Sequence, residues 1–78
     1  LAQQTFNVDA MDHDGQTPLH LIARSRDPLA VVTETIEILL ARGANINARA
    51  KDGATPLTEA AEHGHAEIQQ LLRQRGAT

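Results

Sequence analysis

The stretch DGQTPLHLIA, residues 14–23, recurs in altered form as DGATPLTEAA, residues 52–61. Six of the ten positions are identical, and the two copies stand 38 residues apart. The same register extends backwards, because NVDAMDHDG at 7–15 matches NINARAKDG at 45–53. The chain therefore contains two copies of one structural element.

Each copy carries the start signal of a helix. Thr17 and Thr55 are of a residue type that favours the N-cap position, and Pro18 and Pro56 follow at the first helical position, where a missing N–H costs nothing. Apolar residues then recur at helical spacing in both copies. The pattern predicts a short first helix in each copy, which Gly64 ends in the second one.

A second helix is predicted in each copy. PLAVVTETIEILLAR at 28–42 and AEIQQLLRQR at 66–75 place Leu, Ile and Val at three- and four-residue spacing. Gly43 and Gly76 follow these segments and suit the left-handed position after a helix C-terminus. The unit is therefore loop, helix, turn, helix. Neither helix pair can bury its apolar face alone, so the pairs must stack.

The first copy holds five extra residues between its helices. Asp27 followed by Pro28 resembles an N-cap and a first helical residue, which predicts a helix that begins at about Pro28 and extends one turn beyond its counterpart. An ordinary irregular loop is the alternative interpretation.

The composition favours one small all-α domain. The chain has 78 residues, 41% of them hydrophobic, with a single Phe and neither Trp nor Tyr, so that the core must be built from aliphatic side chains. The formal charge of −3 does not favour binding to the phosphate backbone of a nucleic acid. No apolar stretch approaches the roughly 20 residues that span a bilayer. The absence of cysteine favours a reducing, cytoplasmic setting, with nuclear or secreted-effector settings as alternatives.

The segments DHDGQTPLHLIA, LLARGANINA and KDGATPLTEAAEHGHAEIQQLLRQRGA resemble ankyrin repeats, and the resemblance covers about residues 7–77. It implies an all-α ankyrin-repeat solenoid of stacked antiparallel helix pairs with projecting hairpin loops, used to bind another protein. It also implies that His20 ties neighbouring backbone together through hydrogen bonds to its ring. Thr58 stands at this position in the second copy, which weakens that network there.

The second copy carries polar residues at three positions where the first copy is apolar. These are Glu59, Gln69 and Arg73, which stand opposite Leu21, Ile36 and Leu40. Because a terminal repeat needs a polar outer face, we interpret 45–78 as a C-terminal capping repeat and 7–44 as a repeat with a five-residue insertion. We interpret 1–6 as the remnant of a preceding helix, all within one domain over 1–78.

Matched onto the resemblance, ten positions at the loop tips and along the first helices are expected to contact a partner protein. They are His13, Asp14, Gln16, Arg24, Ser25, Lys51, Asp52, Ala54, Glu62 and His63. A set without Trp or Tyr lacks the commonest interface anchors, so we expect it to form a modest part of a larger contact area. The alternative for each of these residues is that it is simply solvated surface. The alternative function is structural, in which the repeats cap a longer array or pack against further ankyrin repeats or domains of the same polypeptide.

A metal site or an enzyme is the third hypothesis. His63 and His65 flank Gly64, with Glu62 and Glu67 nearby, but two-residue spacing does not place both rings on one helical face. The loop aspartates have no nucleophile or oxyanion donor beside them. We therefore expect no metal, no cofactor and no catalysis.

Overall fold

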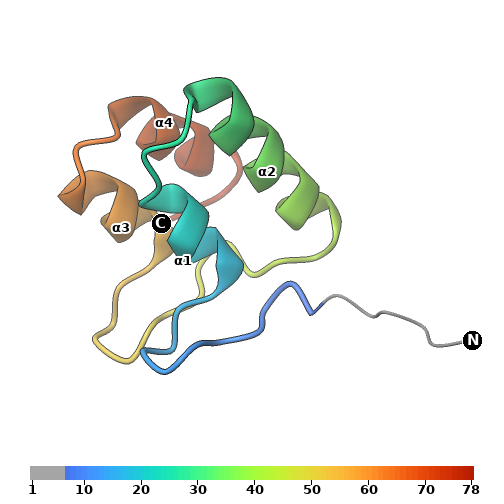
Figure 1. The fold of residues 1–78 in the computed structure, drawn as a ribbon, viewed down its shortest axis with the longest axis vertical. Helices are drawn as coiled ribbons and strands as arrows, with labels where there is room; N and C mark the ends of the chain where they lie inside the picture. The colour runs from blue at the N-terminus through green and yellow to red at the C-terminus, as the bar shows by residue number, and fades with distance from the viewer. Residues whose placement is uncertain (1–6) are drawn as a thin grey trace, which may run out of the picture.

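The computed structural model describes residues 7–78, and the helix remnant predicted at 1–6 lies outside this part of the chain. The described elements are four helices, α1 (Pro18–Ala23), α2 (Leu29–Ala41), α3 (Pro56–Glu62) and α4 (Ala66–Gln74) (Figure 1). This confirms the prediction of an all-α fold. We call residues 7–44 the first unit and residues 45–78 the second unit.

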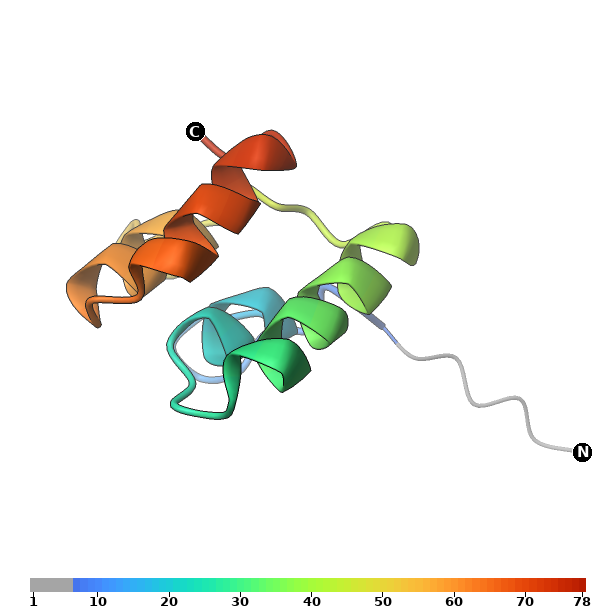
Figure 2. The same cartoon turned by 90° about the horizontal axis from the view of Figure 1, so that it is seen from above.

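The two helix pairs stack on one another. The inner helices α1 and α3 are in contact, as are the outer helices α2 and α4, and each inner helix also packs against the outer helix of its own unit. Figure 2 shows the two pairs side by side, with the second unit following the first. The loops before α1 and α3 project together to one side of the helices (Figure 1).

Aliphatic side chains fill the space between the helices. Leu19, Val32, Ile36, Ala60 and Leu72 are fully buried and belong to one core cluster. Small alanines let the inner helices approach closely, and aliphatic side chains supply most of the apolar area removed from water. The core belongs to both units, which is why neither pair is expected to be stable alone.

The first helices begin as the sequence predicts. Thr17 and Thr55 have extended backbone and are the N-cap residues of α1 and α3, and a proline follows each of them in the first turn. The helix ends at Gly43, Gly64 and Gly76 all have positive φ, which a residue with a side chain rarely adopts.

The start of α2 differs from the prediction. The helix begins at Leu29, with Pro28 itself as the N-cap residue and the Pro28 carbonyl accepting the Val32 N–H at 3.1 Å. Asp27 is therefore not the cap, and its own N–H donates to Ser25 Oγ at 3.0 Å. The reason is the extended ψ of 142° at Pro28, which moves the helix start by one residue. The predicted extension is correct, because α2 has 13 residues and α4 has 9.

The interpretation of Glu59 as part of a polar outer face is wrong. Glu59 is only 4% exposed and faces the first unit, where it accepts a hydrogen bond from Gln16, whereas its counterpart Leu21 is 46% exposed. Because the units stack in the same orientation, equivalent positions face the same way along the stack. Leu21 therefore faces away from the second unit.

Gly15 and Gly53 provide a matched pair for testing how the loops are joined. Both have positive φ, 76° and 85°, but a Cβ on Gly15 would lie 2.9 Å from the backbone nitrogen of Lys51, whereas one on Gly53 would meet nothing within 4 Å. We predict that Gly53→Ala lowers the free energy of unfolding by about 1 kcal/mol, the cost of a left-handed conformation. Gly15→Ala should cost about twice as much or more, because the two loops must also separate. Urea denaturation of both variants measures this, and equal losses would contradict it.

Candidate functional site

The first finger loop, residues 7–17, is closed by the carboxylate of Asp12. Asp12 Oδ1 accepts the N–H groups of Asp14 and Gln16, each at 2.9 Å, and the Asp12 N–H donates to the Gln16 carbonyl at 3.0 Å. The Gln16 N–H, more than any other group, lowers the pKa of Asp12, since hydrogen bonds to the ionised form favour it. The carboxylate thus holds the finger in shape from inside.

The second finger loop, residues 45–55, has the same backbone pattern with a different side-chain acceptor. The Ala50 N–H donates to the Ala54 carbonyl at 2.8 Å, but Ala50 supplies no carboxylate. Asp52 Oδ1 takes over part of this role by accepting the Ala54 N–H at 3.0 Å. The tip of the second finger is therefore closed by one hydrogen bond to an aspartate carboxylate, where the tip of the first finger has two.

The fingertips are fastened side by side. The Lys51 N–H donates to the Asp14 carbonyl at 2.9 Å, an approach that the lack of a side chain at Gly15 permits. A hollow of about 180 Å³ lies beside this contact and is lined by Asp14, Gln16, Lys51 and Asp52. Both signs of charge meet around it, which suits polar contacts with a partner rather than burial of an apolar side chain.

His20 joins the first inner helix to the second finger. Its ring is fully buried, and Nδ1 accepts the Thr17 N–H at 3.1 Å. Nε2 must then carry the proton, because its partner is the Ala54 carbonyl at 2.7 Å. Thr58 reproduces only the local part of this arrangement, since its Oγ1 accepts the Thr55 N–H at 2.7 Å and its side chain is exposed.

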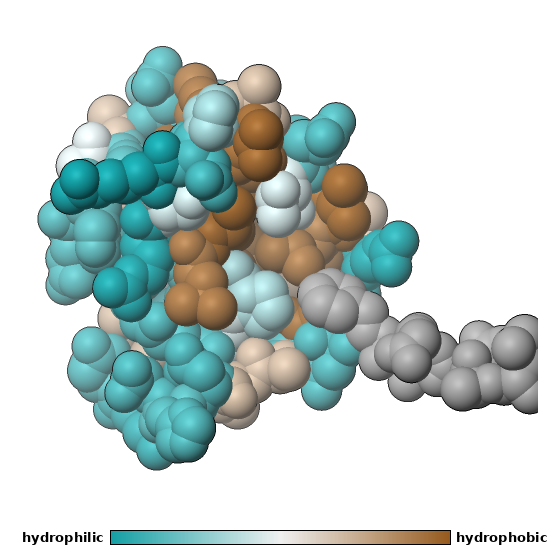
Figure 3. Space-filling view, in the orientation of Figure 1, coloured by the Kyte–Doolittle hydropathy of each residue, from teal (hydrophilic) through white to brown (hydrophobic). Residues whose placement is uncertain are grey.

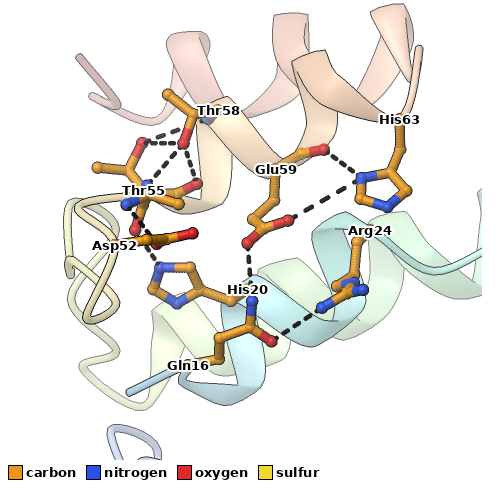
Figure 4. A network of polar contacts seen from close by, with 9 residues as sticks. Gln16, His20, Arg24, Asp52, Thr55, Thr58, Glu59 and His63 are labelled. Carbon is orange, nitrogen blue, oxygen red and sulfur yellow. Dashed lines mark hydrogen bonds and ion pairs between the residues drawn. The ribbon is translucent and has the colours of Figure 1, made fainter. Parts of the chain in front are cut away.

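A polar network crosses the contact between the inner helices (Figure 4). Gln16 Nε2 donates to Glu59 Oε2 at 2.8 Å, and Arg24 donates to Gln16 Oε1 at 3.0 Å. His63 Nδ1 donates to the Glu59 carbonyl at 2.9 Å and lies 3.9 Å from Glu59 Oε1. The buried carboxylate thus fixes which way the Gln16 amide points, and the amide holds the Arg24 guanidinium along α1.

The structure presents most, but not all, of the predicted contact residues. Gln16 and Ala54 are buried, with 8% and 9% of their surface exposed. The Gln16 amide and the Ala54 carbonyl form hydrogen bonds between the units, and Gln16 also lines the fingertip hollow. Ser25 is half-buried and accepts from the Asp27 N–H. The remaining seven are exposed, namely His13, Asp14, Arg24, Lys51, Asp52, Glu62 and His63.

Sequence reasoning did not identify the groove at the opposite end of the inner helices. It has a volume of about 310 Å³ and is lined by the insertion residues Ser25, Arg26, Asp27 and Leu29 together with residues 64–68. The five extra residues were the signal that could have indicated it, because they lengthen the turn that forms one wall.

The structure also bears on metal binding and on membrane spanning. Across residues 7–78, no group of three or more His, Cys, Asp or Glu side chains is placed to hold a metal ion, and His63 and His65 stack their rings 6.3 Å apart. Among the described helices, none combines the length and the apolar character needed to cross a membrane.

Comparison with known proteins decides the family. The family model described as "Ankyrin repeats (3 copies)" matches residues 1–78. The chain belongs to the ankyrin repeat family. Its all-α architecture of stacked helix pairs is thus an ankyrin fold, as the TPLH motif and the recurring glycines predict. Ankyrin repeats serve generally as non-catalytic modules for protein–protein interaction.

Relatives share the repeats but are much longer. The chain is 44% identical to human ankyrin repeat domain-containing protein 53 over 59 residues, covering 76% of the chain and 11% of that protein. It is 46% identical to mouse Rabankyrin-5, covering 76% of the chain and 5% of that protein. Human ankyrin repeat and KH domain-containing protein 1 is 50% identical over 44 residues, 56% of the chain and 2% of that protein. The chain thus spans about a tenth or less of these relatives.

Asp12→Ala is predicted to destabilise the first finger in a pH-dependent way. The folded state lowers the pKa of Asp12, so its stabilising effect is present above about pH 4, the ordinary pKa of an aspartate, and is lost as the pH falls below it. The difference in urea midpoint between wild type and Asp12→Ala should therefore be clear at pH 7 and shrink at pH 3. Asp14→Ala is the control, since only its backbone holds the fingers together. A difference that does not depend on pH would contradict the assignment.

Proposed function

We propose that this ankyrin module binds a partner protein through its two finger loops and the exposed ends of its inner helices. The observation that carries the proposal is the fastening of the fingers, in which the Lys51 N–H to Asp14 carbonyl bond holds two polar loop tips side by side around one hollow. Loops held rigid before binding lose little conformational freedom on binding, which favours recognition.

The chemistry of the surface indicates the kind of contact it makes. Arg24 is oriented by Gln16 and offers the remaining guanidinium donors to solvent. His63 and Glu62 lie at the corresponding end of α3 and are exposed. With neither Trp nor Tyr in the chain, we expect recognition by charged hydrogen bonds and shape rather than by a deeply buried aromatic anchor.

A structural role is the second candidate, and the far face of the second unit favours it. Gln69 and Arg73 occupy the positions that Ile36 and Leu40 hold in the first unit, and Arg73 is exposed. A polar face of this kind suits the capping end of an array. In that case the second unit keeps an ankyrin array soluble and contacts no separate protein. The absence of cysteine supports a cytoplasmic setting for either role.

The two candidates are separated by capture from a lysate with matched variants. The test variant changes Asp14, Arg24, Lys51 and Glu62 to Ala, and the control variant changes four outer residues of the same charges, Glu34, Arg42, Glu67 and Arg73. We predict that proteins retained by the wild-type chain and the control variant are lost from the test variant. Circular dichroism and urea midpoints must show that both variants are folded.

If the finger variant retains the same proteins as wild type, the fingers and inner helices are not the binding surface. If the wild-type chain retains no specific protein, the structural role is favoured.

A further inference from the structure

Arg24, the C-cap residue of α1, has no acidic partner among residues 7–78. The ion pairs in this part of the chain join His63 to Glu59 and Arg75 to Glu37, and residues 1–6 contain neither Asp nor Glu. Arg24 is exposed, and one of its N–H groups donates to the uncharged amide oxygen of Gln16 at 3.0 Å. Because a guanidinium has five N–H donors, most of them remain for other acceptors.

The Gln16 amide that holds Arg24 is itself held by a buried carboxylate (Figure 4). Gln16 and Glu59 are 8% and 4% exposed, and Gln16 Nε2 donates to Glu59 Oε2 at 2.8 Å. An ionised carboxylate can only accept hydrogen bonds, so the amide must turn its NH₂ group to Glu59 and its oxygen to Arg24. Glu59 therefore orients Gln16, and Gln16 orients Arg24.

The order of these three groups keeps the charge of Arg24 available. Arg75 and Glu37 show the alternative, in which a guanidinium donates from two nitrogens to one carboxylate and its charge is neutralised. With the Gln16 amide between Arg24 and Glu59, the guanidinium is oriented by an uncharged acceptor instead. Its full charge and its free donors face solvent.

We propose that Arg24 binds an Asp or Glu side chain of the partner protein, and that Gln16 and Glu59 are positioning residues that orient it. The proposal rests on partner binding at the fingers and inner helices, and it names the side chain that the partner contributes. A guanidinium binds a carboxylate through two parallel hydrogen bonds when its plane is held in one orientation. Figure 3 shows hydrophilic side chains over the projecting loops, so the partner meets polar groups there.

Acidic residues on α3 favour a carboxylate over a phosphate as the group that Arg24 binds. Glu59 is buried on this neighbouring helix, and Glu62 is exposed at the position that corresponds to Arg24 in the second unit. Like charges oppose the binding of a phosphoserine, which carries nearly two negative charges. A carboxylate carries only one, so the repulsion is smaller.

Random linear peptides displayed on phage serve as the probe and are selected on the wild-type chain. We expect the selected peptides to contain an Asp or Glu whose replacement by Asn or Gln lowers affinity about tenfold or more, the usual size of a hydrogen bond to a charged group. Arg24→Gln should weaken the acidic peptides by a similar factor and leave their amide forms unchanged, as measured by fluorescence anisotropy. This substitution changes an exposed side chain, so it does not threaten folding.

An exchange of two side chains separates positioning from folding. Gln16→Glu with Glu59→Gln keeps both hydrogen bonds and the net charge, but it sets a carboxylate directly against Arg24. We expect this variant to unfold at a urea midpoint close to that of wild type and to lose the preference for acidic over amide peptides. Glu67→Gln with Gln70→Glu is the matched control, since both residues are exposed on α4, and it should leave the preference unchanged.

Three results would overturn the proposal. The first is a selection that yields no peptide whose binding depends on both Arg24 and an acidic residue. The second is an exchange variant that folds as wild type and still prefers acidic peptides, because Gln16 and Glu59 would then only join the units. The third is tighter binding of phosphoserine than of Glu at the same position of a peptide.

The same peptides distinguish this failure from failure of the partner surface as a whole. Peptides that bind the variant with Asp14, Arg24, Lys51 and Glu62 changed to Ala as tightly as wild type would show that the fingers and inner helices are not the binding surface. Peptides that lose affinity for Lys51→Ala but not for Arg24→Gln would leave that surface in place and overturn the role of Arg24 alone.

Discussion

The hydrogen bond from His20 Nε2 to the Ala54 carbonyl joins the first unit to the second, and the rest of the structure depends on it. The Thr17 N–H occupies Nδ1, so the ring has only its Nε2 proton to give, and that proton reaches across to the base of the second finger. A fully buried imidazole would be costly if either nitrogen were unpaired. The start of α1, the ring and the second finger therefore form together.

The remaining contacts extend this link in both directions. On the finger side, the Lys51 N–H to Asp14 carbonyl bond aligns the loop tips. On the helix side, Leu19 and Ala60 close the apolar space between the inner helices. Each contact joins segments more than 30 residues apart, so the units depend on each other in the way that repeat proteins depend on their neighbours.

Local signals predicted the helices well, because capping and helix termination depend on a few adjacent residues. Thr-Pro at a helix start and Gly after a helix end act within one turn, and the first helices begin where those rules place them. The predicted N-cap of α2 was wrong by one residue because both Asp27 and Pro28 can stand at such a boundary, and the ψ of Pro28 decides between them.

The site was harder to predict, because it depends on which way equivalent positions face along the stack. Glu59 was interpreted as part of a polar outer face, but it is buried and accepts a hydrogen bond from Gln16. Gln16 and Ala54 are expected at the partner surface, and the sequence did not indicate that the Gln16 amide and the Ala54 carbonyl form hydrogen bonds between the units. Only the three-dimensional register shows that Leu21 and Ile38 face outwards while their counterparts face a neighbour.

Contacts between the units hold both of them folded. Hydrogen exchange of His20→Ala tests it most directly, with His13→Ala as the exposed control. We expect the free energy of unfolding to fall by roughly 2–4 kcal/mol, because the Ala54 carbonyl and the Thr17 N–H both lose their partner. Amide protection should fall together in α1 to α4. Loss of protection in α1 and α2, with α3 and α4 unchanged, would show that the second unit folds without the first.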